Sequence, residues 1–275
     1  MIHRALLALS TCLILAACGG HSGFPPRINA VKPVSMQYGQ TATVLVGGKD
    51  LRFSVQVDSG GACTDPSYGS SSTTEVLELN CKVAATGDMV LTFRAENGDL
   101  LYQTSLNVPN PQVSLITNQG SMTLELNPMA APISVNNFLQ YVNKGFYKDT
   151  LFHRVIPGFV IQGGGYTTGM VKKTNPSAPI VLESNKGLSN LRGTVAMART
   201  AEPNSATSEF FVNLVDNTSL DYKSEAQPGY AVFGTVVQGM DDVVTTIASQ
   251  ATSRQSGFDD VPVQDVIILS ARQIR

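Results

Sequence analysis

Hydrophobic and polar residues alternate in short stretches from about Ile28 to Val108. Successive side chains of a strand point to opposite faces of a sheet, so this period of two predicts strands with one buried face. Asn97-Gly98, between two such stretches, is a strong signal for a two-residue hairpin. The alternating positions are Leu51, Phe53, Val55 and Val57; Leu77, Leu79, Cys81 and Val83; Met89, Leu91, Phe93 and Ala95; and Leu100, Tyr102, Thr104 and Leu106. We therefore expect a small antiparallel β-sandwich over residues 28–108.

A second pattern follows the two prolines of NVPNPQ, and we place a second domain at residues 109–275. Strand-like alternation resumes on both sides of a turn at 118–120, which predicts a hairpin. An amphipathic helix is then expected between Ser134, as its N-cap, and Gly145, as its C-terminal glycine. A shorter helical pattern contains Val243, Val244, Ile247 and Ala248. Mostly strands with two helices indicate a barrel or sandwich closed at its ends by helices.

The first residues, MIHRALLALSTCLILAACGG, have a short positive start and then an apolar stretch. The stretch is too short to span a bilayer comfortably and has the charge order of a secretory signal. It ends in LAAC, which resembles the bacterial lipoprotein box, in which cleavage precedes the cysteine and the thiol is lipidated. We predict a signal peptide at 1–17 and a lipidated Cys18 followed by a Gly- and Pro-rich tether to residue 27. The alternative is an ordinary signal peptide with an incidental cysteine.

Lipidation of Cys18 would hold the protein to a membrane surface without a spanning helix. The lipoprotein resemblance also implies a location, because Gly19 rather than aspartate after the cysteine suggests the outer membrane, facing the periplasm. Once Cys12 leaves with the signal and Cys18 is acylated, Cys63 and Cys81 remain. In an exported protein such a pair predicts a disulfide.

Charge and composition exclude several classes of function. A net charge of -2 offers no broad basic surface, so we expect no nucleic-acid partner. Of three histidines, His3 belongs to the signal and His21 to the tether, which leaves His153 alone in the second domain. That is too few ligands for a metal site, and no nucleophile elbow, dinucleotide fingerprint or phosphate loop is present. We expect a site without metal or cofactor, in a monomer.

The stretch FHRVIPGFVIQGG places Arg154 and Gln162 among hydrophobic and glycine residues. Rotation about an X-Pro bond needs neither nucleophile nor metal, only passage over a barrier of about 18 to 20 kcal/mol. The twisted amide has a pyramidal nitrogen with a usable lone pair, while the proline ring stays apolar. An apolar cup beside one permanently charged donor is complementary to that state.

At these residues the second domain resembles the cyclophilins, a family of peptidyl-prolyl cis-trans isomerases, and most of all their bacterial periplasmic members. The resemblance covers residues 111–275, and it implies an eight-stranded β-barrel capped by two helices with a proline pocket on its outer face. The motifs that carry it are APISVNNFLQYVNKGFY, FHRVIPGFVIQGGG, NLRGTVAMART, SEFFVNL and GYAVFGTVVQGMD. The segment INAVKPVSMQYGQTATVLVGGKDL is similar to the start of immunoglobulin-like modules called IPT or TIG domains.

The cyclophilin resemblance assigns roles residue by residue. Arg154 matches the catalytic arginine, and Gln162 matches the glutamine that binds substrate and holds the arginine. Ala198 and Arg199 match the backbone segment that pairs with the substrate chain. The walls and floor of the proline pocket match Phe159, Val160, Phe211 and Leu220, with Glu209 and Tyr230 at further substrate-binding positions.

Three departures from the family pattern stand among these positions. Glu209 replaces a usual glutamine, Ser219 replaces a frequent tryptophan, and Tyr230 replaces a common histidine. An added carboxylate near Arg154 could orient it or compete for its charge. The sequence thus predicts an isomerase that acts on proline-containing chains of exported proteins. The alternative is a proline-binding, chaperone or scaffolding lipoprotein with weak catalysis.

Overall fold

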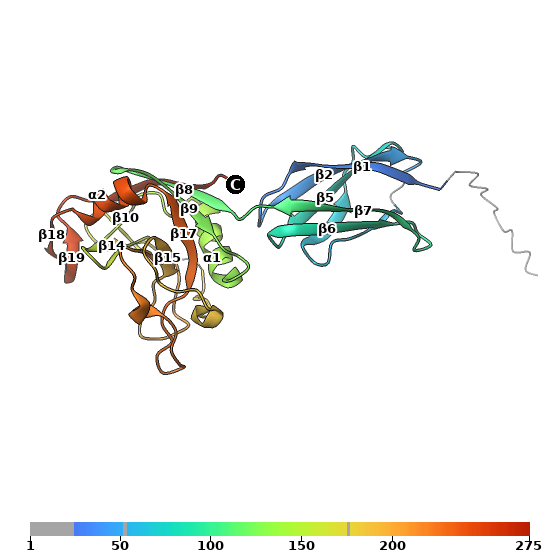
Figure 1. Ribbon diagram of the computed structural model, residues 1–275. Helices are drawn as coiled ribbons and strands as arrows, with labels where there is room; N and C mark the ends of the chain where they lie inside the picture. Colours follow the sequence, from blue (N-terminus) through green and yellow to red (C-terminus); the bar gives the residue numbers. More distant parts are fainter. Residues whose placement is uncertain (1–24, 52–53, 175–176) are drawn as a thin grey trace, which may run out of the picture.

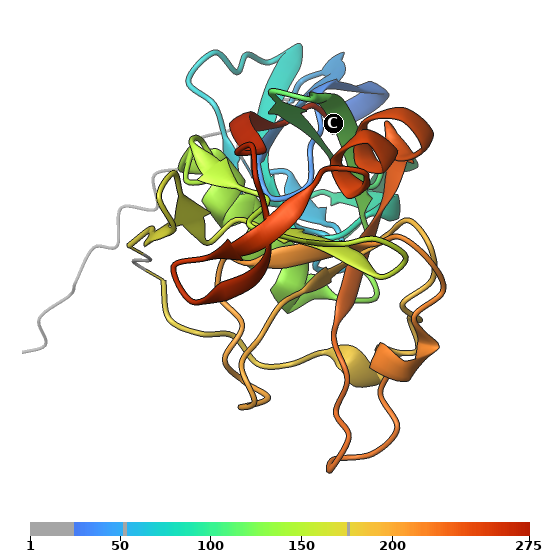
Figure 2. The ribbon, with the colours of Figure 1, turned by 90° about the vertical axis from the view of Figure 1, so that its left-hand side faces the viewer.

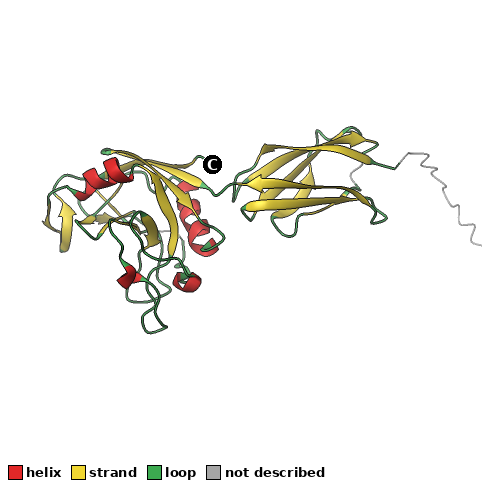
Figure 3. Ribbon diagram, in the orientation of Figure 1, coloured by secondary structure: helices red, strands yellow, loops and turns green. Residues whose placement is uncertain are grey.

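The computed structural model describes residues 25–51, 54–174 and 177–275, and within these ranges the chain is mostly β (Figure 3). The strands form two lobes that are joined near residues 109–111 (Figure 1). The predicted signal peptide, Cys18 and most of the tether lie outside the described residues. No helix within the described ranges is long and apolar enough to cross a membrane.

The N-terminal lobe is a β-sandwich whose two antiparallel sheets share one hydrophobic core. One sheet has the order β1 (Arg27–Ser35), β2 (Thr41–Lys49), β5 (Val76–Val83) and β4 (Cys63–Tyr68); the other has the order β3 (Gln56–Asp58), β6 (Gly87–Arg94) and β7 (Leu100–Val108). Residues at alternate positions of β5 and β6 are buried between the sheets, as the period of two predicts. The immunoglobulin-like assignment of this lobe stays a prediction.

Two details of this lobe differ in how well the sequence predicted them. Cys63 and Cys81 form a disulfide across β4 and β5, with a Cα–Cα distance of 5.5 Å, so that prediction is confirmed. Closing a loop of this length stabilises a fold by about 3 kcal/mol in the chain-entropy model. The strand expected from Leu51 to Val57 is reduced to β3. Leu51 and Val55 are buried, as the alternation predicted, but they lie outside any strand. Phe53 lies outside the described residues.

The second lobe is a closed barrel. Its main sheet has the order β10 (Thr150–Leu151), β20 (Ile267–Gln273), β8 (Gln112–Thr117), β9 (Gly120–Leu126), β17 (Val232–Gln238), β15 (Thr194–Met197), β16 (Phe210–Asn213), β12 (Val160–Gly163) and β11 (Arg154–Ile156). Only Phe152 and His153 separate β10 from β11, so these two are parts of one interrupted strand. One part pairs with β20 and the other with β12, which closes eight strands into a barrel within the described chain. The expected barrel is confirmed.

Two short hairpins stand beside the barrel. β13 (Tyr166–Thr167) pairs with β14 (Val171–Lys172), and β18 (Thr252–Gln255) pairs with β19 (Phe258–Pro262). The long segments that follow β14 and β16, yellow to orange in the colour scale, extend from the same side of the barrel in both views (Figures 1 and 2). They include the short 3₁₀ turns η1 (Ser184–Lys186) and η2 (Thr218–Leu220).

Two helical segments bury apolar faces against the barrel. α1 (Pro132–Asn143) contributes Val135, Phe138 and Val142 to the core and ends before Gly145, whose φ of 66° suits a glycine after a helix. The second pattern forms a π-helical turn, η3 (Met240–Val244), that continues into α2 (Thr245–Ala248). The prediction of two helices is therefore confirmed.

The expected N-cap at Ser134 is wrong by three positions. The helix begins at Pro132, which suits the first turn because proline lacks the N–H that would go unpaired there. Glu183, about fifty residues away, accepts hydrogen bonds from the backbone N–H groups of Ile133 and Ser134 at 3.1 and 2.7 Å. Ser134 donates its hydroxyl to the same carboxylate at 2.8 Å, so its side chain supports a remote cap instead of being one.

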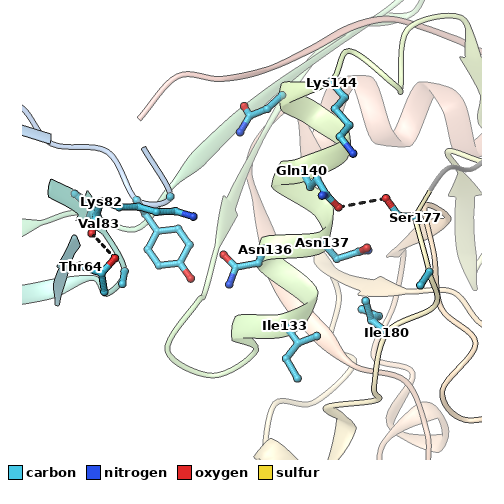
Figure 4. A pocket seen from close by; sticks show the side chains of 15 residues that line it. Thr64, Lys82, Val83, Ile133, Asn136, Asn137, Gln140, Lys144, Ser177 and Ile180 are labelled. Atoms are coloured by element: carbon cyan, nitrogen blue, oxygen red, sulfur yellow. Dashed lines mark hydrogen bonds between the residues drawn. The ribbon is translucent and has the colours of Figure 1, made fainter. Parts of the chain in front are cut away.

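The two lobes meet beside α1. Tyr38 from the sandwich is buried in the barrel core cluster, and its carbonyl accepts a hydrogen bond from Gln273 at 3.0 Å. Next to this contact, a groove of about 1020 Å³ is lined by Lys82 of the sandwich and by Asn136 and Gln140 of α1, among others (Figure 4). None of the predicted catalytic or pocket residues lines this groove.

Candidate active site

The barrel strands carry one row of outward-facing residues. Arg154, Gln162, Phe211, Ala196 and Val232 are Cα partners across β11, β12, β16, β15 and β17. Partners on neighbouring strands project to the same face of a sheet, so the five side chains form a continuous line. Their neighbours along the strands project inward and are buried in the barrel core: Val155, Ile161, Val212 and Val195. The same alternation that fills the core therefore sets Arg154 and Gln162 beside an apolar surface.

The apolar end of this row is a distinct hydrophobic cluster, separate from the barrel core. Its residues are Val160, Ala196, Ala198, Phe211 and Val232, with Phe159, Leu188, Leu220 and Tyr230 packed against them. The ring of Phe211 meets that of Tyr230 edge-on, with centroids 5.5 Å apart. Six of the residues predicted to form the substrate site are thus brought together in one cluster.

A buried network of asparagines holds the loops around this cluster. Asn217 donates hydrogen bonds to the carbonyl of Phe159 at 2.9 Å and to Oδ1 of Asn213 at 2.8 Å. Asn213 in turn donates to Asn190 at 3.2 Å, and Asn190 donates to Asp221 at 2.9 Å. Because the three amides are buried, each must find such partners, and the network fixes where the walls of the cluster stand.

Asp221 anchors the end of that network. Burial alone would raise the pKa of its carboxyl group, but hydrogen bonds from Ser189 and Asn190 outweigh burial and lower it. The ionised carboxylate accepts from the backbone N–H of Asn190 at 2.7 Å, and Tyr230 donates its N–H to the carbonyl of neighbouring Leu220 at 2.9 Å. Leu220 and Tyr230, far apart in a loop, are therefore held on the same side of the cluster.

At the polar end of the row, Arg154 lies beside Gln162, which is in turn hydrogen-bonded to Glu209. Its Nη1 is 3.4 Å from Oε1 of Gln162, and Nε2 of Gln162 donates to Oε2 of Glu209 at 2.9 Å. Glu209 was predicted as a substrate contact, but its carboxylate is engaged with Gln162 and is not part of the apolar cluster. Burial raises the pKa of Glu209, and the hydrogen bond from Gln162 and the charge of Lys172 partly offset this effect.

His153 lies behind these groups, between the two parts of the interrupted strand. It is 3% exposed, and its ring centroid is 4.7 Å from that of Tyr166. Burial lowers its pKa to about 4, an effect that the Leu151 backbone opposes and the charge of Arg154 reinforces. The imidazole is therefore neutral at pH 7, although Nε2 lies 3.4 Å from Oε2 of Glu209.

We expect His153 to make the protein less stable in acid. Its pKa is lower in the folded chain than the ordinary 6.5, so the unfolded chain binds the proton first and the free energy of unfolding falls between about pH 6.5 and pH 4. A shift of this size corresponds to about 3 kcal/mol at pH 4. Urea unfolding of wild type and His153→Phe at pH 7 and pH 4 measures the difference. Parallel pH dependence of the two proteins would contradict this prediction.

Comparison with known proteins decides the family of the barrel. The profile described as "Cyclophilin type peptidyl-prolyl cis-trans isomerase/CLD" matches residues 112–273, more than half of the chain. The chain belongs to the cyclophilin family. It is 49% identical over 164 residues to "Peptidyl-prolyl cis-trans isomerase A" of Dickeya dadantii, which covers 59% of this chain and 84% of the relative. It is 50% identical over 160 residues to "Peptidyl-prolyl cis-trans isomerase B" of Escherichia coli, covering 58% and 96%.

A solved structure agrees with this assignment. The cyclophilin-type isomerase of Cryptosporidium parvum, crystallised in the presence of the dipeptide Ala-Pro, is 28% identical and gives a TM-score of 0.52. The match covers 60% of this chain and 99% of that one. The second lobe is therefore a cyclophilin domain, and the protein is a peptidyl-prolyl cis-trans isomerase of proline-containing polypeptides.

The structure adds residues to the cyclophilin site that sequence reasoning missed. Ala196 and Val232 belong to the apolar cluster, and the alternation of Val195 with Ala196 could have indicated the first of them. Leu188 lies in a loop without periodicity, so no sequence signal pointed to it. The guanidinium of Arg199 lies 4.7 Å from the ring centroid of Tyr230, so its side chain closes over that ring. No cluster of metal-ligating side chains occurs among the residues that the structure describes.

Proposed function

We propose that the isomerase turns X-Pro bonds at the junction of the apolar cluster and Arg154. The observation that carries this proposal is the single row of partners across five strands, with a charged donor at one end and an apolar floor at the other. The proline ring would occupy the cluster over Phe211. The amide nitrogen before the ring would then face the guanidinium of Arg154.

Arg154 would act by stabilising the twisted amide. As the bond rotates, resonance is lost and the prolyl nitrogen gains a lone pair that can accept a hydrogen bond from the guanidinium. Arginine stays charged throughout and only donates, so it favours this state over the planar ground state. A rate gain of four decades requires about 5.5 kcal/mol, within reach of one charge-assisted hydrogen bond together with correct placement.

The substrate chain would run along the segment of Ala198 and Arg199. The N–H of Ala198 already donates to the carbonyl of Glu209 at 3.0 Å, so pairing with substrate would use other backbone groups of this segment. The Arg199 side chain donates to the carbonyl of Gly229 at 2.9 Å. It would therefore hold Tyr230 against the bound chain rather than contact the rotating bond.

The N-terminal residues support a proposal about where the protein acts. Its clients would be exported proteins that fold at the outer membrane. Cys18 would carry the lipid and residues up to 27 would form the tether. We expect the protein to incorporate labelled palmitate and to sediment with membranes. A version whose leader is replaced by one without a lipidated cysteine should be soluble in the periplasm.

Cys12→Ser is the matched control for this experiment, because the replaced thiol would leave with the signal peptide. It should keep both the label and the membrane fraction. A wild-type protein that is exported but remains soluble and unlabelled would contradict the lipid anchor and leave the isomerase assignment untouched.

A further inference from the structure

Glu209 occupies a slot shaped for its side chain. It immediately precedes β16, its side chain is 24% exposed, and Oε2 lies within reach of both Gln162 and His153. Gly165 forms the opposite wall, where a Cβ atom would come within 2.5 Å of Cγ of Glu209. The third glycine of QGGGY therefore makes room for this carboxylate, which is not part of the apolar cluster.

The Glu209 carboxylate determines which way the Gln162 amide faces. An ionised carboxylate only accepts hydrogen bonds, so it selects the NH₂ end of the amide, at 2.9 Å. The oxygen end then faces Nη1 of Arg154 at 3.4 Å. A guanidinium only donates, so the opposite amide orientation would set donor against donor.

We propose that Glu209 is a positioning residue for Arg154: its carboxylate holds the Gln162 amide with the oxygen toward the guanidinium. The inference rests on the catalytic role proposed above for Arg154. It assigns Glu209 a function other than substrate contact, and it answers whether the added carboxylate orients the arginine or competes for its charge. Because Gln162 lies between the two groups, the carboxylate orients.

Protonation of Glu209 would undo this arrangement. A neutral carboxyl group can donate to the oxygen of Gln162, so the amide can turn over and present its NH₂ group to Arg154. The titratable and charged groups around this carboxyl are Arg154, His153, Tyr166, Lys172, Asp259 and Asp260. His153 is neutral near pH 7 and so contributes no opposing charge there. Since burial raises the pKa of Glu209, the loss begins at a higher pH than for an ordinary glutamate.

The effect of Glu209 on stability has the opposite sign. A carboxyl whose pKa is higher in the folded chain costs stability when ionised, and this cost disappears as the pH falls through the folded pKa. Glu209→Gln is therefore expected to be the more stable protein at pH 7. In wild type, activity should therefore fall in acid while the contribution of Glu209 to stability rises. A glutamate with only a structural role would not show these opposite trends.

The test uses the full chain and an Ala-Pro peptide, with exchange measured by NMR between pH 5 and pH 8. Glu209→Gln carries a neutral amide that, like the protonated carboxyl group, can donate as well as accept, so its activity should stay nearly constant between pH 5 and pH 8, without the decline in acid that wild type shows. Glu209→Met fills the slot with only a weak thioether acceptor and should lose about 10-fold in catalysed exchange, while peptide affinity changes less than about twofold. Circular dichroism and urea unfolding establish that each variant is folded.

Full activity in folded Glu209→Met would overturn the proposal, and so would a decline in acid that Glu209→Gln shares with wild type. Arg154→Ala, measured in the same series, separates this failure from a failure of the proposed site. If Arg154→Ala keeps full activity, the catalytic role of Arg154 itself is wrong. If Arg154→Ala is inactive and Glu209→Met is not, only the positioning role is wrong.

Discussion

Replacing Arg154 by alanine is expected to lower kcat/KM by about 100- to 1000-fold, the loss typical of removing one donor that serves mainly the transition state. The guanidinium is proposed to bind the pyramidal nitrogen, which exists only in the twisted amide. Ground-state binding depends on the apolar cluster, so the dissociation constant of a proline peptide should change little. Steady-state isomerisation assays and peptide titrations on the same samples measure the two quantities.

Arg154→Lys is the matched control for the charge. Lysine is a flexible point charge without the planar fork, so it should restore only a small part of the activity. Arg154 is half-buried at the edge of the barrel, and neither variant should prevent folding. An alanine variant that is folded and within a few fold of wild-type activity would show that catalysis does not depend on this guanidinium.

Replacing Phe211 by alanine is expected to act on substrate binding. The ring is 4% exposed and forms the part of the cluster nearest to Gln162 in the row across the strands. Removing it deletes the floor on which the proline ring would lie, and a loss of about 2 kcal/mol of apolar contact weakens binding by about 30-fold. Truncating a buried phenylalanine also costs about 3 to 5 kcal/mol of stability.

Phe211→Leu separates these two effects. Leucine fills most of the volume and should recover much of the stability, but it does not offer the same flat surface to proline. Peptide titrations followed by NMR and urea unfolding give affinity and stability independently. Unchanged peptide affinity in a folded Phe211→Ala protein would place the proline somewhere other than this cluster.

The periodicity of the sequence accounts for much of the site. In the stretch around Arg154, the period of two sends Val155 and Ile161 into the core and leaves Arg154 and Gln162 outside. The family motifs then assigned the apolar residues, which the structure brings into one cluster. The first feature was predictable because it depends on residues close together in the chain, and the second because each cluster residue lies in or near a motif shared with the family.

Contacts between distant segments were not predictable in this way. The cap of α1 comes from Glu183, and the carboxylate of Glu209 meets His153 and Gln162 from the residue before β16. Neither contact leaves a local pattern, because each depends on how the closed barrel brings its loops together. The groove between the lobes, beside Tyr38 and α1, likewise depends on how two separately folded parts meet.

The most direct test follows exchange of an Ala-Pro peptide by NMR with the full chain, while chemical shifts report where the peptide binds. We predict accelerated cis-trans exchange, with shifts at Phe211, Ala198 and Tyr230 and none at Asn136 or Gln140 in the groove between the lobes. Binding without accelerated exchange would contradict the central claim and favour the alternative of a proline-binding or scaffolding protein. Exchange accompanied by shifts only in the groove would show that the active site has been misplaced.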